Sequence, residues 1–279
     1  MEKSMKFIDM PIINKGITHG GVFHADDVFS TALLQLFNPN LEIERVMKVE
    51  ETIDVNATTG TIVYDIGDGR FDHHHGELKY REDGCPKAAF GLLWEQFGPY
   101  LTDFDESAWK IIDDDLVRAI DAHDNGFEMN NPLSLAIGAF NPCWDENSAP
   151  LDRMMQFKKA VDAARTILAR WLVRANSSAK AKNLVRSYVE ASEHKILILD
   201  QFLPWKDYTT DDEIHFAVYP SERGGWCIQS IDSEKYPLPK EWLDNMPKGI
   251  TFVHKNLFLA AVETKEQAIR YAEYAVSVI

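Results

Sequence analysis

The chain has 279 residues, of which 45% are hydrophobic and 26% charged, a composition that excludes disorder over most of its length. Its formal net charge of -15 disfavours binding to phosphate polymers over most of the surface. No apolar run approaches the roughly 18 residues of a membrane span, and residues 1–10 contain no apolar signal segment. The three cysteines are too far apart to indicate a disulfide framework or a thiolate metal site. We therefore expect a cytoplasmic protein without a membrane partner.

The first half of the chain alternates strand-like and helix-like patterns. We expect strands over residues 12–18, 42–49 and 61–66, and helices over residues 26–37, 88–97 and 107–123. Strands that alternate with helices predict a parallel sheet.

The second half begins with a break over residues 141–150, after which one or two long helices are expected as far as residue 192. Further strands are expected over residues 196–199, 214–219, 226–231 and 250–253, with a final helix over residues 265–278. We predict an α/β protein with three parts: an N-terminal parallel-sheet domain over residues 1–150, a helical connector over residues 151–192 and a smaller C-terminal α/β domain over residues 193–279. The connector is rich in basic residues, which indicates either a solvated helix face or one wall of a phosphate groove.

Two histidines and two aspartates gather where the first strand leads into the first helix. They are His19, His24, Asp26 and Asp27. Ligands in such sheets sit beyond the carboxyl ends of the strands, and imidazole together with carboxylate suits Mn, Fe or Zn. Helix capping is the alternative for the two aspartates.

Two further segments place carboxylates and imidazoles after the third expected strand. Asp65 ends that strand, although a turn-initiating role would also explain it. Asp72, His73, His74 and His75 follow closely. Neighbouring side chains of an extended segment point in opposite directions, so one histidine can bind a metal while the next faces a substrate. Asp72 can orient an imidazole; a solvated histidine run is the alternative.

A fourth segment lies where the helix over residues 107–123 ends. Asp124 directly precedes the helix stop Asn125-Gly126, which aims its carboxylate off the helix end. Asp121 lies one turn earlier. We predict that Asp124 is a ligand and that Asp121 supports it, with a solvated helix residue as the alternative for either.

In this order, the four segments resemble the motifs of the DHH phosphoesterase superfamily. More closely, residues 18–27 and 70–74 resemble the melanocyte-proliferating-gene (Myg) exonuclease family, whose opening motif is threonine-histidine-x-glycine-x-phenylalanine-histidine-x-aspartate. Residues 120–126, 225–231 and 252–254 are also similar to segments of that family. The resemblance extends over nearly the whole chain.

The resemblance implies two divalent metal ions, commonly Mn, with Mg, Zn or Fe as alternatives. It implies that the first ion is held by His19, His24 and Asp65, and the second by Asp26, Asp65, His73 and Asp124. The catalytic residues would be Asp65, Asp72 and His74, and the substrate would contact His74, Arg223 and His254. The supporting residues around the ligands would be Asp27, His75 and Asp121.

The implied function is that of a metal-dependent phosphodiesterase acting on nucleic acid or short oligonucleotides, as a 3′–5′ exonuclease on RNA or DNA. A phosphohydrolase of a small nucleotide or pyrophosphate is the first alternative, and a non-catalytic binding protein held together by metal is the second. An amidohydrolase is disfavoured because no His-x-His pair precedes the site. The oligomeric state is left open, with a homodimer among the options.

The sequence departs from the family near its C-terminal end. Ala260 and Ala261 stand where the family has a glycine pair, and Cys227 stands where it tends to have a basic residue. Methyl groups at the glycine positions are expected to hinder the approach of a phosphate, which predicts a preference for short substrates.

Overall fold

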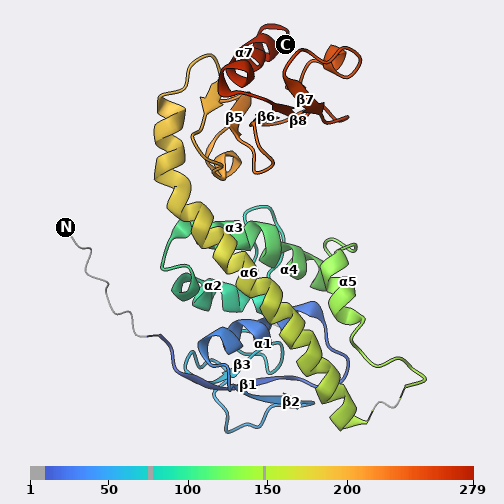
Figure 1. The fold of residues 1–279 in the computed structure, drawn as a ribbon. Coiled ribbons are helices and arrows are strands. Elements are labelled where there is room, and N and C mark those ends of the chain that lie inside the picture. The colour runs from blue at the N-terminus through green and yellow to red at the C-terminus, as the bar shows by residue number, and fades with distance from the viewer. Residues whose placement is uncertain (1–9, 75–77, 147–148) are drawn as a thin grey trace, which may run out of the picture. The chain divides into compact units, whose positions relative to one another are not determined.

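A computed structural model describes residues 10–74, 78–146 and 149–279, and the chain forms two compact units, Met1–Asn176 and Ser177–Ile279. Its elements are, in chain order, β1 (Ile13–His19), α1 (Ala25–Phe37), β2 (Glu42–Val46), β3 (Gly60–Val63), α2 (Ala89–Leu101), α3 (Glu106–Ile112), α4 (Arg118–Asp124), α5 (Pro132–Gly138), α6 (Pro150–Glu190), β4 (Ile196–Ile198), β5 (Phe216–Pro220), β6 (Trp226–Ser230), β7 (Ile250–Val253), β8 (Leu259–Val262) and α7 (Lys265–Ser277) (Figure 1). The predicted α/β class is confirmed. The domain limits at residues 150 and 192 stay predictions.

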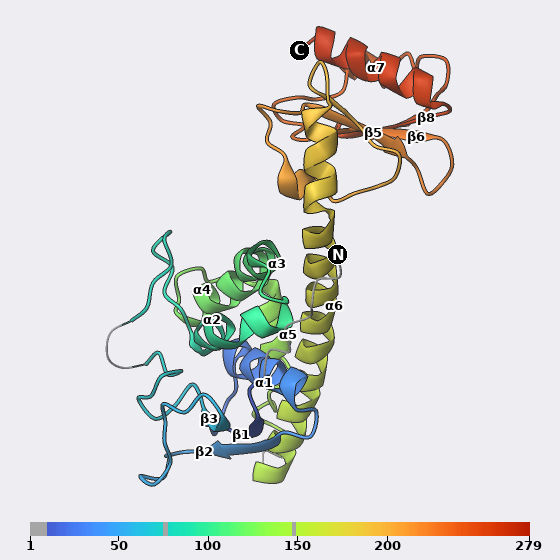
Figure 2. The same cartoon turned by 90° about the vertical axis from the view of Figure 1, so that its left-hand side faces the viewer.

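The first unit is built on a parallel sheet with the strand order β2-β1-β3. The apolar residues Ile13 and Ile17 of β1 are buried, as are Val28, Phe29 and Leu33 of the helix α1 that follows it. Figure 2 shows α1 and α2 on one face of this sheet and the irregular segments after β2 and β3 together on one side of it. The carboxyl ends of β1 and β3 therefore face an irregular region that can form a site.

The single helix expected over residues 107–123 is interrupted by a π-helical turn, Asp113–Val117, between α3 and α4. The guanidinium group of Arg81 donates to Asp113 at 2.9 Å and to Asp121 at 2.6 Å. Residues seven apart share one face of an α-helix. The wider turn takes up one extra residue, so two aspartates eight apart come onto the same face and bind one arginine.

The long helix α6 has a buried apolar stripe in the first unit. Phe157, Val161, Ala164 and Leu168 are all buried, as the spacing in the sequence predicts. The last turns of the helix belong to the second unit. Among the described residues, no helix combines the length and the apolar character that crossing a membrane requires.

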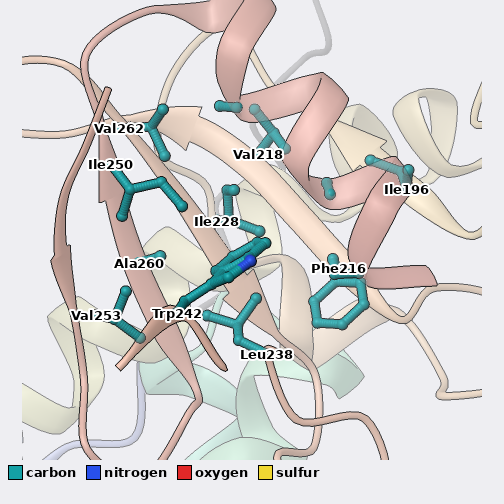
Figure 3. Close-up of a cluster of buried hydrophobic side chains, with 13 residues drawn as sticks. Ile196, Phe216, Val218, Ile228, Leu238, Trp242, Ile250, Val253, Ala260 and Val262 are labelled. Carbon is teal, nitrogen blue, oxygen red and sulfur yellow. The ribbon is translucent and has the colours of Figure 1, made fainter. Parts of the chain in front are cut away.

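The second unit contains a mixed sheet with the strand order β4-β5-β6-β8-β7. Alternate residues of β5 pack on its two faces: Phe216 and Val218 face the side covered by α7, and Ala217 and Tyr219 face the side covered by the end of α6. Figure 3 shows Trp242 near the middle of the first of these clusters. Each face of the sheet thus has its own buried core.

The position of Ala260 corrects one expectation from the sequence. Ala260 lies in β8, is fully buried and packs in the cluster around Trp242 (Figure 3). Its methyl group fills the interior of the unit, so the expectation that it hinders a phosphate is wrong for this residue. Cys227 is also buried, in the cluster on the opposite face. Ala261 pairs with Cys227 of the neighbouring strand β6. For Ala261 the expectation that its methyl group hinders a phosphate stays a prediction.

Candidate metal centre

The site begins where β1 and β3 end side by side. In their parallel pairing Ile17 lies opposite Val63, so His19 and Asp65, each two residues further along, leave the sheet at the same edge. The Nε2 atom of His19 is 3.1 Å from Oδ2 of Asp65. Asp65 has a left-handed backbone with φ 57°, and its N–H donates to the carbonyl oxygen of Phe71 at 3.0 Å. This turn holds the carboxylate at the strand end.

The first turn of α1 adds two fully buried carboxylates, Asp26 and Asp27. A helix N-terminus favours negative charge. Oδ1 of Asp27 accepts a hydrogen bond from the N–H of His24 at 2.9 Å, and its Oδ2 is 3.2 Å from Nε2 of His19. Asp27 therefore caps the helix and also contacts His19, which makes it a candidate ligand in addition to its predicted supporting role.

His73 lies among three carboxylates. Its Nε2 atom is 3.2 Å from Oδ1 of Asp65, 3.2 Å from Oδ2 of Asp124 and 3.8 Å from Oδ2 of Asp26. Its Nδ1 atom is 3.3 Å from the carboxamide oxygen of Asn125. The Asn125 nitrogen donates to the carbonyl oxygen of Asp121 at 2.9 Å, which fixes the orientation of the amide. Nδ1 of His73 must then donate, and Nε2 faces the carboxylates.

His74 is more exposed and is oriented by Asp72. Its Nδ1 atom is 2.8 Å from Oδ1 of Asp72, which also accepts the backbone N–H of His74 at 3.1 Å. The other carboxylate oxygen of Asp72 accepts the N–H of Asp68 at 2.8 Å. Burial opposes ionisation of Asp72, but these hydrogen bonds lower its pKa below the usual range. A fixed carboxylate thus holds a half-exposed imidazole beside the cluster.

Three sets of side chains place ligand atoms within 4.8 Å of one another: His19, Asp27 and Asp65; Asp65, His73 and His74; and His24, Asp26 and Asp124. All six predicted ligands occur in these sets. The grouping differs from the sequence-based one for His24, which lies with the carboxylates of Asp26 and Asp124. The ring of His24 is nevertheless only 5.8 Å from that of His19, measured between centroids.

The carboxylate of Asp26 gives the strongest reason to expect a cation. It is fully buried, and neither oxygen has a hydrogen-bond donor among the described residues. Burial raises its pKa well above the usual range, and the charges of Asp65, Asp124 and Asp27 add to this effect. An unsatisfied buried polar group costs about 1–3 kcal/mol, and more if it is charged. Imidazole and carboxylate donors suit Mn, Fe or Zn, so the residues present fit a divalent metal.

Two histidines of the cluster, His19 and His73, carry raised pKa values. Burial disfavours the charged ring of His19, but the hydrogen bonds to Asp27 and Asp65 raise its pKa to about 10. Burial acts likewise on His73, and there Asp124 and Asp65 raise the pKa to about 10. Burial disfavours the ionised form of Asp65, yet hydrogen bonds from both histidines lower its pKa to about 2. The carboxylates around the two rings thus favour the charged form of each ring.

Asp121 lies apart from the cluster. It is fully buried, accepts the N–H of Gly91 at 3.0 Å and pairs with Arg81. Burial raises its pKa to about 7 against the effect of Arg81. A Cβ atom on Gly91 would overlap the carboxylate, so only glycine fits this close approach of α2 and α4. Asp121 therefore positions the helix end that carries Asp124.

Two of the predicted residues lie elsewhere in the structure. His75 lies outside the described residues. Arg223 is exposed in the hairpin between β5 and β6, and His254 follows β7, where its ring packs 4.2 Å from that of Phe258, measured between centroids. Both belong to the second unit, and their roles stay predictions.

Two residues near the cluster are not indicated as site residues by the sequence. Asn125 was interpreted only as a helix stop, although it directly follows a predicted ligand. Arg45, in β2, lies 3.8 Å from Oδ2 of Asp27, and its guanidinium carbon is 4.4 Å from the centre of the Phe157 ring. No sequence pattern indicates that Arg45 belongs to the site, because it lies outside all of the motifs.

Comparison with known proteins identifies the family. The family model MYG1_exonuc, described as "Uncharacterised protein family (UPF0160)", matches residues 15–276. The chain belongs to this family. The MYG1 proteins of Schizosaccharomyces pombe, Dictyostelium discoideum and Chlamydia pneumoniae are 27%, 24% and 27% identical to it, over 92%, 91% and 91% of this chain and 96%, 94% and 93% of their own. The name of the model supports a nuclease or phosphoesterase, which implies a nucleic acid or nucleotide substrate.

Proposed function

We propose that the protein is a cytoplasmic, metal-dependent phosphodiesterase that degrades RNA or DNA oligonucleotides from the 3′ end. The observation that carries the proposal is the fully buried carboxylate of Asp26, which accepts no hydrogen bond from the described residues and lies within a cluster of imidazoles and carboxylates. The family name supports the exonuclease class. The motifs that resemble those of DHH phosphoesterases support a pair of divalent ions, Mn in the first instance.

The ligands proposed for the ions are those implied by the sequence, and Asp27 joins them as a candidate beside His19. A divalent pair supplies positive charge for the phosphoryl oxygens and a nucleophile from water at neutral pH. Asp65 contacts both His19 and His73, which favours its role as the shared ligand. We infer that His74, whose Nδ1 atom is 2.8 Å from Asp72, would donate a hydrogen bond to the phosphoryl group.

A panel of phosphoesters tests the function: a 5-mer RNA, a dinucleotide, a cyclic dinucleotide and pyrophosphate, each with Mn and with a chelator. Hydrolysis of the oligonucleotides that stops with the chelator supports the proposal. A 5-mer labelled at one end shows the direction of degradation. Hydrolysis of pyrophosphate alone would favour a small-molecule phosphohydrolase, and metal binding without any hydrolysis would favour a binding protein.

Substitution of the shared ligand makes the test specific. Asp65→Asn is expected to lower turnover more than any other single ligand change, because both metal positions lose a charged donor. Each tenfold loss corresponds to about 1.4 kcal/mol of barrier. Asp211→Asn, an exposed carboxylate that pairs with Lys235 in the second unit, is the control. Near-wild-type turnover of Asp65→Asn with two bound metals would show that the assignment is wrong.

A further inference from the structure

A recess of about 830 Å³ opens beside the metal centre, within the first unit. On one side it is lined by His19, Asp65 and His74 of the cluster. On the other side it is lined by residues from the segments 46–55 and 66–68, which follow β2 and β3. We call this cavity the side recess. Its volume is that of a site for a small molecule, of about 300–1,000 Å³, which suits a nucleotide-sized group and not a long strand.

Part of the wall of the side recess is apolar. Met47 is 84% exposed and Val22 is 55% exposed, and both line the recess. Met47 lies close over the end of β1: a Cβ atom on Gly20 would come within 3.0 Å of its sulfur. The N–H of Gly20 donates to the carbonyl oxygen of Val46 at 2.6 Å, which ties the two segments together. An exposed thioether held beside the catalytic cluster is a favourable contact for an aromatic ring.

The polar residues of the side recess are mainly acidic. Outside the cluster they are Glu50, Glu51 and Asp68, against the single basic residue Lys48. Exposed carboxylates repel a phosphate group by about 1 kcal/mol each at contact distance in water. A strand that continued through the recess would bring its next phosphate toward this acidic lining. The recess therefore favours a group that is aromatic and uncharged.

We propose that the side recess holds the terminal nucleoside of the substrate, with its base against Met47 and Val22 and with a free hydroxyl toward Glu50 and Glu51. This inference rests on the proposed function, because the scissile phosphate must lie at the cluster. It names the substrate class of the site: oligonucleotide ends that carry no terminal phosphate. A strand end with a phosphate would face the carboxylates of Glu50 and Glu51.

Five versions of one dinucleotide test the inference, each measured as kcat/KM with Mn. One has free hydroxyls at both ends, one a phosphate at the 3′ end, one a phosphate at the 5′ end, one no base at the 3′ end, and one no base at the 5′ end. At one end, and not at the other, a phosphate should lower kcat/KM by about tenfold, the size expected from one or two like-charge contacts. Removal of the base at that same end should lower it by about tenfold or more, in the range of one lost base contact.

Two variants connect these effects to the side recess. The double variant Glu50→Gln, Glu51→Gln should recover most of the activity on the phosphorylated end, whereas Glu106→Gln, an exposed glutamate on α3, should not. Met47→Ala should raise KM for the substrate with both bases and leave the substrate without the terminal base unchanged. Met155→Ala, another exposed methionine, is its control.

The outcomes separate the two proposals. If neither the terminal base nor the terminal phosphate changes kcat/KM, the side-recess inference is overturned and the phosphodiesterase function still stands. The same holds if the Glu50 and Glu51 changes affect all five substrates equally. No hydrolysis of any substrate with Mn, Mg, Zn or Fe would overturn the proposed function, and the inference with it.

Discussion

Replacement of Asp26 by Asn should have opposite effects on the metal-free and metal-loaded protein. In the metal-free protein Asp26 is a fully buried carboxylate without a donor, surrounded by other carboxylates. Asparagine keeps the shape, removes the charge and brings an N–H₂ group that can donate to Asp124. The metal-free variant should therefore be more stable than the wild type, although it has lost a residue of the site.

The magnitude follows from the burial of this group. Relief of one unsatisfied buried polar group is worth about 1–3 kcal/mol, which corresponds to about 2–4 °C in Tm per kcal/mol for a unit of this size. The pKa of Asp26 is raised above its usual 3.8 by burial and by neighbouring charges. The free-energy cost of burying the ionised Asp26 is therefore absent below pH 3.8 and grows as the pH rises above it. The gain in stability should be clear at pH 7.5 and should shrink toward pH 4.

Metal reverses the comparison. A ligand at 100 times its Kd stabilises the folded state by about 2.7 kcal/mol. Loss of a partner around a metal ligand already weakens binding by about 10–100-fold, so loss of a ligand itself should weaken it by at least 100-fold. At the same Mn concentration the variant would then keep only about 0.4 kcal/mol of metal stabilisation.

The assay is thermal unfolding with a chelator and with a series of Mn concentrations. Asp121→Asn is the matched control, because Asp121 is also a fully buried aspartate but pairs with Arg81. It should be less stable than the wild type with chelator, where Asp26→Asn is more stable, and it should keep more of the Mn-induced shift than Asp26→Asn does, because it removes no proposed ligand. An Asp26→Asn protein that is less stable with chelator and shifts with Mn as the wild type does would refute the reasoning.

Three further expectations follow from the contacts of the site. Since the pKa values of His19 and His73 are about 10, Mn binding at pH 7 should release about two protons and should become tighter as the pH rises. Calorimetry in buffers of different ionisation enthalpy measures the protons released. A binding enthalpy that does not depend on the buffer would contradict this expectation. Asn125→Ala should weaken Mn binding by about 10–100-fold, because it frees Nδ1 of His73; an unchanged metal titration would exclude this role. Gly91→Ala should lower the free energy of unfolding by about 1–3 kcal/mol, because its methyl group meets the Asp121 carboxylate; an unchanged urea midpoint with unchanged slope would contradict it.

Regular elements of the fold could be predicted where apolar periodicity decides them. The strand expected over residues 12–18 and the helix over residues 26–37 occur as β1 and α1, within one residue at each end. The helix α5 and the strand β8 were missed. α5 has only seven residues, and β8 contains Ala260 and Ala261, whose small side chains give no strand pattern. Its place next to the edge strand β7 comes from pairing with β6 and β7, which no local sequence pattern shows.

The candidate site was predictable because its residues follow strand ends and helix ends. His19 and Asp65 leave parallel strands at one edge, which alternation of strands and helices already implies. Contacts made by the residues around them depend on tertiary structure instead. Arg45 approaches Asp27 only because β2 pairs with β1, and Arg81 meets Asp121 only because a π-helical turn shifts the helix face. Sequence spacing cannot show either contact.

An acidic chain repels the phosphate groups of its expected substrate. A metal centre would supply the positive charge that lets the two bind. Four carboxylates, Asp26, Asp27, Asp65 and Asp124, converge on the end of one small sheet, and the described side chains of the side recess add more negative than positive charge. Folding normally pairs a buried charge or neutralises it. Here the pairing is incomplete at Asp26, because the fold buries its carboxylate without a hydrogen-bond donor among the described residues. Such conflicts concentrate at functional sites, because the missing partner is a ligand and not another side chain. A divalent cation would satisfy the buried carboxylates and, in the same position, provide the positive charge that a phosphate needs.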